Sequence, residues 1–245
     1  MRKLTAIITA LVLSSFMLNA QVKEKFKTYE IIPKGEKLAG LQFAYLNMNS
    51  ENSEYLLLAN GLDAKASFSS LSPMIAYAIS GNHVIGGKIS FSSATGSLDA
   101  TTLSLLNDHE NKNVKIIALS DISASLRQKS LSVFYRTYLG LEEKCRFGLF
   151  YEYALSYGYS RTAFSLDGSS DDWSDNRKAR LSFSPGLVFF PSSNISTQVS
   201  VSLADVTWNK TTYVNDGDIK GTKTGFRSQL SLDLLGISFG LVIHI

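Results

Sequence analysis

The sequence predicts an all-β fold, an eight-stranded antiparallel up-and-down transmembrane β-barrel, and three observations lead to it. After Leu38, large apolar side chains alternate with small or polar ones along most of the chain, which is the period-two pattern of strands with two different faces. Short and long connections take turns between these segments. An apolar N-terminal stretch behind a basic start marks the chain for export.

The first twenty residues have the features of a secretory signal peptide. Two basic residues precede a short apolar stretch that ends in a small residue, Ala20, as signal peptidase substrates do. We predict a signal peptide over residues 1–20, a polar periplasmic lead-in over 21–37 and an outer-membrane barrel over 38–245. A membrane anchor helix is the alternative, but the stretch contains two serines and is short for a span.

Eight segments carry the alternation, and each is predicted to form one strand. They centre on residues 41–45, 70–79, 85–91, 131–140, 147–159, 180–189, 198–203 and 226–245. In the last segment the apolar positions change from even to odd numbers, which indicates a β-bulge near Leu235-Gly236. Residues 120–126 also have strand character, so a protruding hairpin or a kinked fourth strand is an open alternative.

The connections differ in length in a regular way. Tight turns are expected near residues 80–83, 142–146 and 191–194, and long polar connections near 47–65, 97–129, 162–177 and 210–225. Short periplasmic turns, long extracellular loops and an even number of strands are typical of bacterial outer-membrane barrels. A soluble sandwich has no reason to gather its long loops at one end. We therefore expect four long extracellular loops.

The two faces of the strands follow from the physics of the membrane. A sheet that crosses hydrocarbon must close, because unpaired backbone groups there are too costly, and its large apolar face then meets lipid. Aromatic residues are expected at the two membrane interfaces: Tyr77, Phe189 and Phe190 beside tight turns, and Phe91, Tyr157 and Tyr159 toward the long loops. A water-soluble barrel with the apolar side inward is the alternative, but that set would overfill so narrow a barrel.

The small or polar set is expected to fill the lumen, with Gln42 and Gln198 among its members. Its charged members form a predicted polar plug: Lys88, Arg136, Glu152 and Arg180. A turn centred on Lys144 places Arg136 directly opposite Glu152, where an ion pair would neutralise two lumen charges and block flow. A polar gate or proton path is the alternative function of this pair.

No catalytic, cofactor or metal site is predicted. The formal net charge of +3 is made of interspersed charges, which offers no basic patch for nucleic acid. The single cysteine, Cys145, cannot form an internal disulfide, and His83 and His244 have no visible partner. Three segments with weak signals for acid–base, calcium or phosphate chemistry are interpreted as solvated loops: 108–110, 167–175 and 217–224.

Three stretches resemble the small outer-membrane β-barrel proteins of Bacteroidota, the porin-like, OmpA-type eight-stranded family. They are residues 71–77 with 82–87, 134–138 with 147–152, and 184–190. The resemblance extends over nearly all of 38–245 and specifies architecture only. It implies insertion into the outer membrane of a Gram-negative bacterium, with outer-membrane lipid and the barrel-insertion machinery as partners.

Three functions remain open from the sequence. The preferred one is a non-enzymatic barrel with a structural or surface-recognition role, whose extracellular ligand the sequence does not name. The second is a narrow porin-like channel for small or apolar solutes. The third is an outer-membrane enzyme that modifies lipid.

Overall fold

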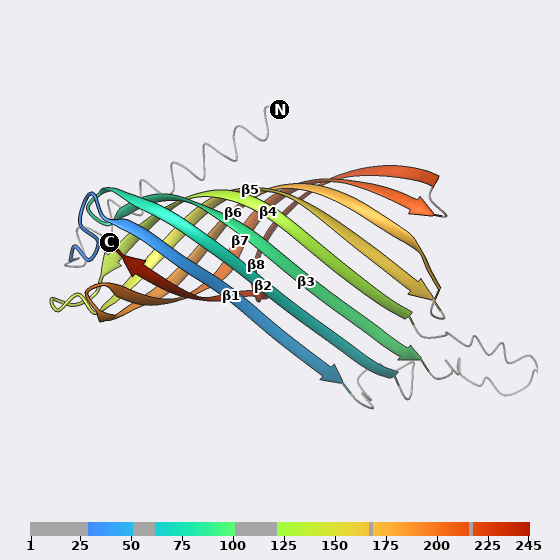
Figure 1. Cartoon of the computed structure of the whole chain (residues 1–245), viewed down its shortest axis with the longest axis horizontal. Helices are drawn as coiled ribbons and strands as arrows, with labels where there is room; N and C mark the ends of the chain where they lie inside the picture. The colour runs from blue at the N-terminus through green and yellow to red at the C-terminus, as the bar shows by residue number, and fades with distance from the viewer. Residues whose placement is uncertain (1–28, 51–61, 101–121, 167–168, 216–217) are drawn as a thin grey trace, which may run out of the picture.

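Eight antiparallel strands follow one another around a closed barrel, so the predicted all-β fold with eight strands is confirmed (Figure 1). The computed structural model describes residues 29–50, 62–100, 122–166, 169–215 and 218–245. The strands are β1 (Lys37–Ser50), β2 (Leu62–Ser80), β3 (His83–Ala100), β4 (Ile122–Gly140), β5 (Phe147–Leu166), β6 (Ser169–Ser192), β7 (Ile195–Asn215) and β8 (Asp218–His244). No helix in these ranges is long and apolar enough to cross a membrane.

The three predicted tight turns are confirmed. Two residues separate β2 from β3 and β6 from β7, and residues 141–146 join β4 to β5. Asn82 in the first of these turns has a φ of 62°, a left-handed conformation that asparagine tolerates better than most residues. These turns gather at one end of the barrel, which we call the turn end.

Two of the four predicted long loops are wrong. Strands β5 and β6 continue to Leu166 and Ser169, and strands β7 and β8 continue to Asn215 and Asp218, so both connections are tight hairpins. The polar residues there belong to paired strands, because serine, threonine and aromatic residues suit a sheet that has left the apolar zone. The cores of the other two connections, 51–61 and 101–121, lie outside the described residues.

Two uncertain points of the strand assignment are settled. Residues 122–126 form the beginning of β4 and pair with both β3 and β5, so they are not an additional strand. In β8 the pairing with β7 shifts between Leu230 and Ser238, which confirms the predicted bulge. The apolar face therefore changes parity without leaving the outside of the barrel.

Large apolar side chains cover the outside of the barrel and polar ones point inward, as predicted. Leu131 is 62% exposed, whereas its neighbour Ser132 is 3% exposed. The inverted alternative, with the apolar side inward, is thereby wrong for these strands. The prediction that Phe190 lies at the membrane interface is wrong, since this side chain is 8% exposed and packs within the barrel against the ring of His244.

The seam between the first and last strands is short. Strand β1 pairs with β8 through six residue pairs, from Leu38 with His244 to Phe43 with Phe239. Beyond Phe43, β1 pairs with β2, and residues 218–230 of β8 pair with β7. Figure 1 shows the outer parts of β1 and β8 diverging. The barrel is therefore closed toward the turn end and open along this seam toward its outer end.

The described part of the lead-in lies across the turn end. The backbone amides of Ile31 and Ile32 donate to the Asn82 side chain at 2.8 and 3.0 Å, and Asn82 donates in turn to the carbonyl oxygen of Tyr29 at 2.9 Å. Ile32 is fully buried. Residues 29–36 are thus held firmly, unlike the loose segment that their composition predicts. The predicted signal peptide lies outside the described residues.

Candidate functional site

The interior of the barrel has an apolar core toward the turn end. Its side chains come from the lead-in, from β1 to β6 and from β8: Ile32, Leu38, Met74, Ala78, Val84, Phe134, Tyr138, Phe150, Ala154, Val188, Phe190 and Val242. The prediction that all lumen positions are small or polar is therefore wrong in this half. The sequence carries a signal for it, because several lumen-parity positions near the tight turns hold large apolar residues.

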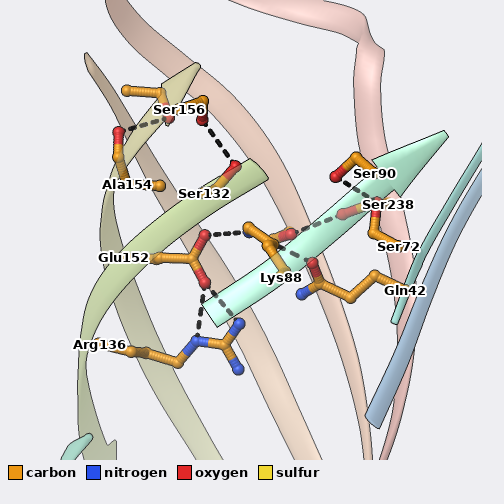
Figure 2. Close-up of polar contacts among 12 residues, drawn as sticks. Gln42, Ser72, Lys88, Ser90, Ser132, Arg136, Glu152, Ala154, Ser156 and Ser238 are labelled. Atoms are coloured by element: carbon orange, nitrogen blue, oxygen red, sulfur yellow. Dashed lines mark hydrogen bonds and ion pairs between the residues drawn. The ribbon is translucent and has the colours of Figure 1, made fainter. Parts of the chain in front are cut away.

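A cluster of charges, drawn in Figure 2, lies next to this core, where the Arg136 guanidinium contacts the rings of Phe134 and Phe150. Glu152 accepts hydrogen bonds from the Lys88 Nζ at 2.5 Å and from the Arg136 Nε and Nη2 at 3.2 and 2.6 Å. The register of β4 and β5 places Arg136 directly opposite Glu152, as predicted. Both are almost completely buried, at 1% and 4% exposed. Charge-assisted contacts of this kind are the strongest hydrogen bonds in proteins.

The remaining polar atoms of the cluster reach across the lumen. The Arg136 Nη1 donates to Gln198 Oε1 on β7 at 2.6 Å and to the Tyr138 hydroxyl at 3.0 Å. The Lys88 Nζ donates to Gln42 Oε1 on β1 at 3.4 Å. The guanidinium also lies 4.6 Å from the centre of the Phe150 ring, a favourable cation–π contact. The cluster thereby links strands on opposite sides of the barrel.

Arg180, the fourth predicted plug residue, lies in a separate pair. Its Nη2 donates to Asp205 Oδ2 and to Ser202 Oγ, both at 3.0 Å. Its Nε is buried and has no hydrogen-bond partner among the described residues. The structure therefore brings Lys88, Arg136 and Glu152 together and places Arg180 farther along the lumen wall.

A polar cavity of about 360 Å³ lies next to the charge cluster, on the side away from the apolar core. Ten serines line it: Ser70, Ser90, Ser92, Ser130, Ser132, Ser156, Ser182, Ser184, Ser202 and Ser238. Several hydroxyls pair across neighbouring strands, as Ser132 does with Ser156 at 2.9 Å. The cavity was not predicted from the sequence, although serines recur at lumen positions of seven strands.

Another unpredicted arrangement lies at the turn end. Ser196 Oγ is 2.8 Å from His244 Nε2, and His244 Nδ1 is 2.5 Å from Glu36 Oε1. Serine, histidine and carboxylate stand in this order in hydrolase active sites, but Ser196 is fully buried. A substrate cannot reach the buried hydroxyl. The hydrogen bonds of His244 therefore have a structural role, which is to hold the end of the last strand against β7 and the lead-in.

The other candidate residues of the sequence have structural surroundings or lie outside the described residues. His83 contacts the Tyr135 hydroxyl at 2.7 Å, so both His83 and His244 have partners, contrary to expectation. Segment 108–110 lies outside the described residues, and residues 218–224 belong to β8. In the described ranges no group of three histidine, cysteine or acidic side chains could hold a metal ion.

Asp175, the described acidic side chain of segment 167–175, forms an ion pair near the tip of the β5–β6 hairpin. The Arg161 Nε donates to it at 2.7 Å, and the Tyr159 hydroxyl donates at 2.5 Å. The hydrogen bonds from Arg161 hold the pKa of Asp175 below its usual value. The guanidinium of Arg161 also lies 5.6 Å from the ring of Trp173. These contacts join β5 to β6 in the outer part of the hairpin.

Comparisons with known proteins give structural likenesses alone. No family model matches the chain, and no curated protein matches it. Neisserial surface protein A is 12% identical, with 86% of this chain and 97% of that one covered and a TM-score of 0.35. The outer membrane protein OprG from Pseudomonas aeruginosa is 12% identical, with 87% and 97% covered and a TM-score of 0.45. Ail, the attachment invasion locus protein of Yersinia pestis, is 14% identical, with 86% and 99% covered and a TM-score of 0.36. Likenesses this weak carry no weight for function.

Proposed function

We propose that this chain is an outer-membrane β-barrel protein without enzymatic activity, with a structural or surface-recognition role and a lumen that does not conduct ions. Its apolar outer surface supports membrane insertion. Side chains such as Leu41, Ile75 and Leu187 are 42%, 71% and 58% exposed. A soluble monomer rarely exposes so continuous an apolar surface, whereas a lipid-facing barrel requires one.

The observation that carries the non-conducting assignment is the filled turn half of the lumen. The apolar core there is buried, and the side chains of Lys88, Arg136 and Glu152 cover its inner surface. An eight-stranded barrel leaves an interior just wide enough for side chains to fill. This packing of the described side chains supports a lumen that is closed to water and ions in the turn half.

The outer hairpins support a role at the cell surface. Tyr213, Ile219 and Phe164 lie near the outer ends of β7, β8 and β5 and are 43%, 72% and 45% exposed. Exposed aromatic and aliphatic side chains outside a core are favourable contact points for a partner. The hydrogen-bonded Arg161–Asp175 pair fixes the shape of one hairpin before any partner binds.

Two measurements test this proposal together. Mature protein refolded in detergent should migrate faster on a gel unheated than after boiling, and native protein should fractionate with the outer membrane. In planar bilayers it should show no discrete conductance steps under conditions in which a known porin conducts. A soluble periplasmic protein whose band does not shift on heating would refute membrane insertion, and regular conductance steps would refute the closed lumen.

One observation favours a channel as the second candidate. The serine-lined cavity of about 360 Å³ is polar and occupies the lumen beyond the charge cluster, as the vestibule of a pore would. Rearrangement of the Lys88–Glu152 contact would be needed to extend it. The Ser196–His244 pair gives no support to the third candidate, a lipid-modifying enzyme, because its hydroxyl is buried.

A further inference from the structure

The serine-lined cavity continues outward into an apolar pocket of about 320 Å³. Phe68 and Leu126 line both spaces. Beyond them the pocket is lined by Leu46, Ala66, Ala94 and Ala124. The outer half of the lumen therefore changes from polar and charged near the cluster to apolar farther out, over neighbouring positions of the same strands.

The polar end of this space has an excess of positive charge. Lys88, Lys178 and Arg180 line the cavity together with one carboxylate, Glu152. Lys88 and Arg136 share the single carboxylate of Glu152, whereas Arg180 pairs with Asp205. These five side chains therefore carry three positive and two negative charges, which leaves one cation in excess.

A buried excess charge is costly unless an opposite charge or several hydrogen bonds compensate it. An anion in the cavity would supply that charge and accept hydrogen bonds from the serine hydroxyls. The buried Nε of Arg180, which has no partner among the described residues, is an additional donor on the same wall. The pocket beyond is lined mainly by apolar side chains, with Ser67, Thr95 and Thr162 as its polar members, and it would accommodate an alkyl chain attached to the anion.

The open seam provides a way in for such a molecule. Because β1 and β8 diverge beyond Phe43 and Phe239 (Figure 1), the described strands leave the outer half of the lumen open along this side. Lateral entry from lipid rests on the proposed membrane location, whereas binding itself depends on the cavity alone.

We propose that the outer half of the lumen binds an anionic amphiphile with a single alkyl chain. Its head group, a carboxylate or a similar oxyanion, lies among Lys88, Lys178 and Arg180. Its chain packs against Leu46, Phe68 and Leu126. The molecule ends at the charge cluster and does not pass into the turn half of the barrel.

Binding is tested with octanoate as the probe and the whole mature barrel in lipid nanodiscs, which contain no competing detergent. Isothermal titration calorimetry should show saturable binding of octanoate. Octanol, which lacks the charge, and acetate, which lacks the chain, should each bind at least about tenfold more weakly, since each loses one half of the site. Empty nanodiscs measure partitioning into lipid and are subtracted.

Two pairs of variants locate the site. Lys178→Gln should weaken octanoate binding by about tenfold, whereas Lys129→Gln, on the outside of β4, should leave it unchanged. Phe68→Ala should weaken it severalfold, whereas Phe91→Ala, on the outside of β3, should not. These substitutions are at half-buried or exposed positions, and the heat-dependent gel shift checks that each variant is folded.

Octanoate binding equal to that of octanol, or equal losses in the lumen variants and their controls, would overturn the proposal. The proposed function is judged separately by fractionation and conductance. A silent, membrane-inserted barrel that fails to bind octanoate would refute the ligand site alone.

Discussion

Replacing Glu152 by glutamine should be the most damaging single change in the charge cluster. The amide keeps the size of the side chain but removes the negative charge that Lys88 and Arg136 share. Two cations then face each other in the lumen, with Arg136 1% exposed. Removing one partner from a buried ion pair typically costs about 3–5 kcal/mol.

Lys88→Met should lower the free energy of unfolding much less than Glu152→Gln, although it also removes a contact of the Glu152 carboxylate. It leaves the two-bond pair between Arg136 and Glu152 in place and removes the excess cation of the cluster. The remaining loss is one charge-assisted hydrogen bond beside a polar cavity, about 1–2 kcal/mol. Glu152→Gln should therefore cost at least about 1 kcal/mol more than Lys88→Met, and this difference is the diagnostic quantity.

The free energy of unfolding can be measured by urea titration of the barrel refolded into lipid vesicles, followed by the fluorescence of the two tryptophans. Heat-dependent gel mobility would verify that each variant closes. Equal costs for Glu152→Gln and Lys88→Met would refute the assignment of Glu152 as the shared counter-charge. A cost below about 1 kcal/mol for Glu152→Gln would do so as well, because it would mean that water screens the cluster.

Three further predictions concern packing, pH and the turn end. Gly86→Ala should cost about 1–3 kcal/mol by overpacking, since its Cβ would lie 2.5 Å from a backbone carbonyl oxygen, whereas the Cβ of Gly87→Ala would have its nearest neighbour at 3.7 Å; urea midpoints compare the two. The pKa of Asp175 is lowered by Arg161, so the ion pair stabilises the hairpin fully above the ordinary aspartate pKa of about 3.9. This stabilisation is lost as the pH falls through the lower pKa of the folded state. Amide hydrogen exchange in the hairpin should accelerate at that pH in the wild type, whereas the same fall in pH should cause no further acceleration in Asp175→Asn. Asn82→Gly keeps the left-handed turn but removes three hydrogen bonds to the lead-in. Proteolysis within residues 29–36 should therefore accelerate while the barrel stays closed. An unchanged rate of cleavage would show that the Asn82 side chain does not hold this segment.

Local pattern was enough to predict the strands and their faces. Alternation reports whether a side chain points to the lumen or outward, as Leu131 and Ser132 illustrate, because the period of a strand is two residues. A tight turn also determines the register of the hairpin that it joins. For this reason the Arg136–Glu152 pairing could be predicted from the sequence.

The length of the strands was harder to predict from the same pattern. Beyond the apolar zone, polar side chains occupy both faces, and the alternation fades although the backbone pairing continues. The segments of β5 and β6 around Arg161 and Asp175 therefore have the composition of a loop and the hydrogen bonds of a hairpin. The difference depends on the neighbouring strand, since it supplies the partners for the backbone groups.

The all-β class, the order of the strands and the side to which most side chains point could be predicted from the sequence, because these properties depend on neighbours in the chain. Contacts across the lumen were decided by the tertiary structure. Arg136 meets Gln198 and His244 meets Glu36 because closure of the barrel brings distant strands face to face. The apolar core, the serine-lined cavity and the short seam have the same origin, since depth along the lumen and distance across it follow from strand tilt and register around the whole barrel.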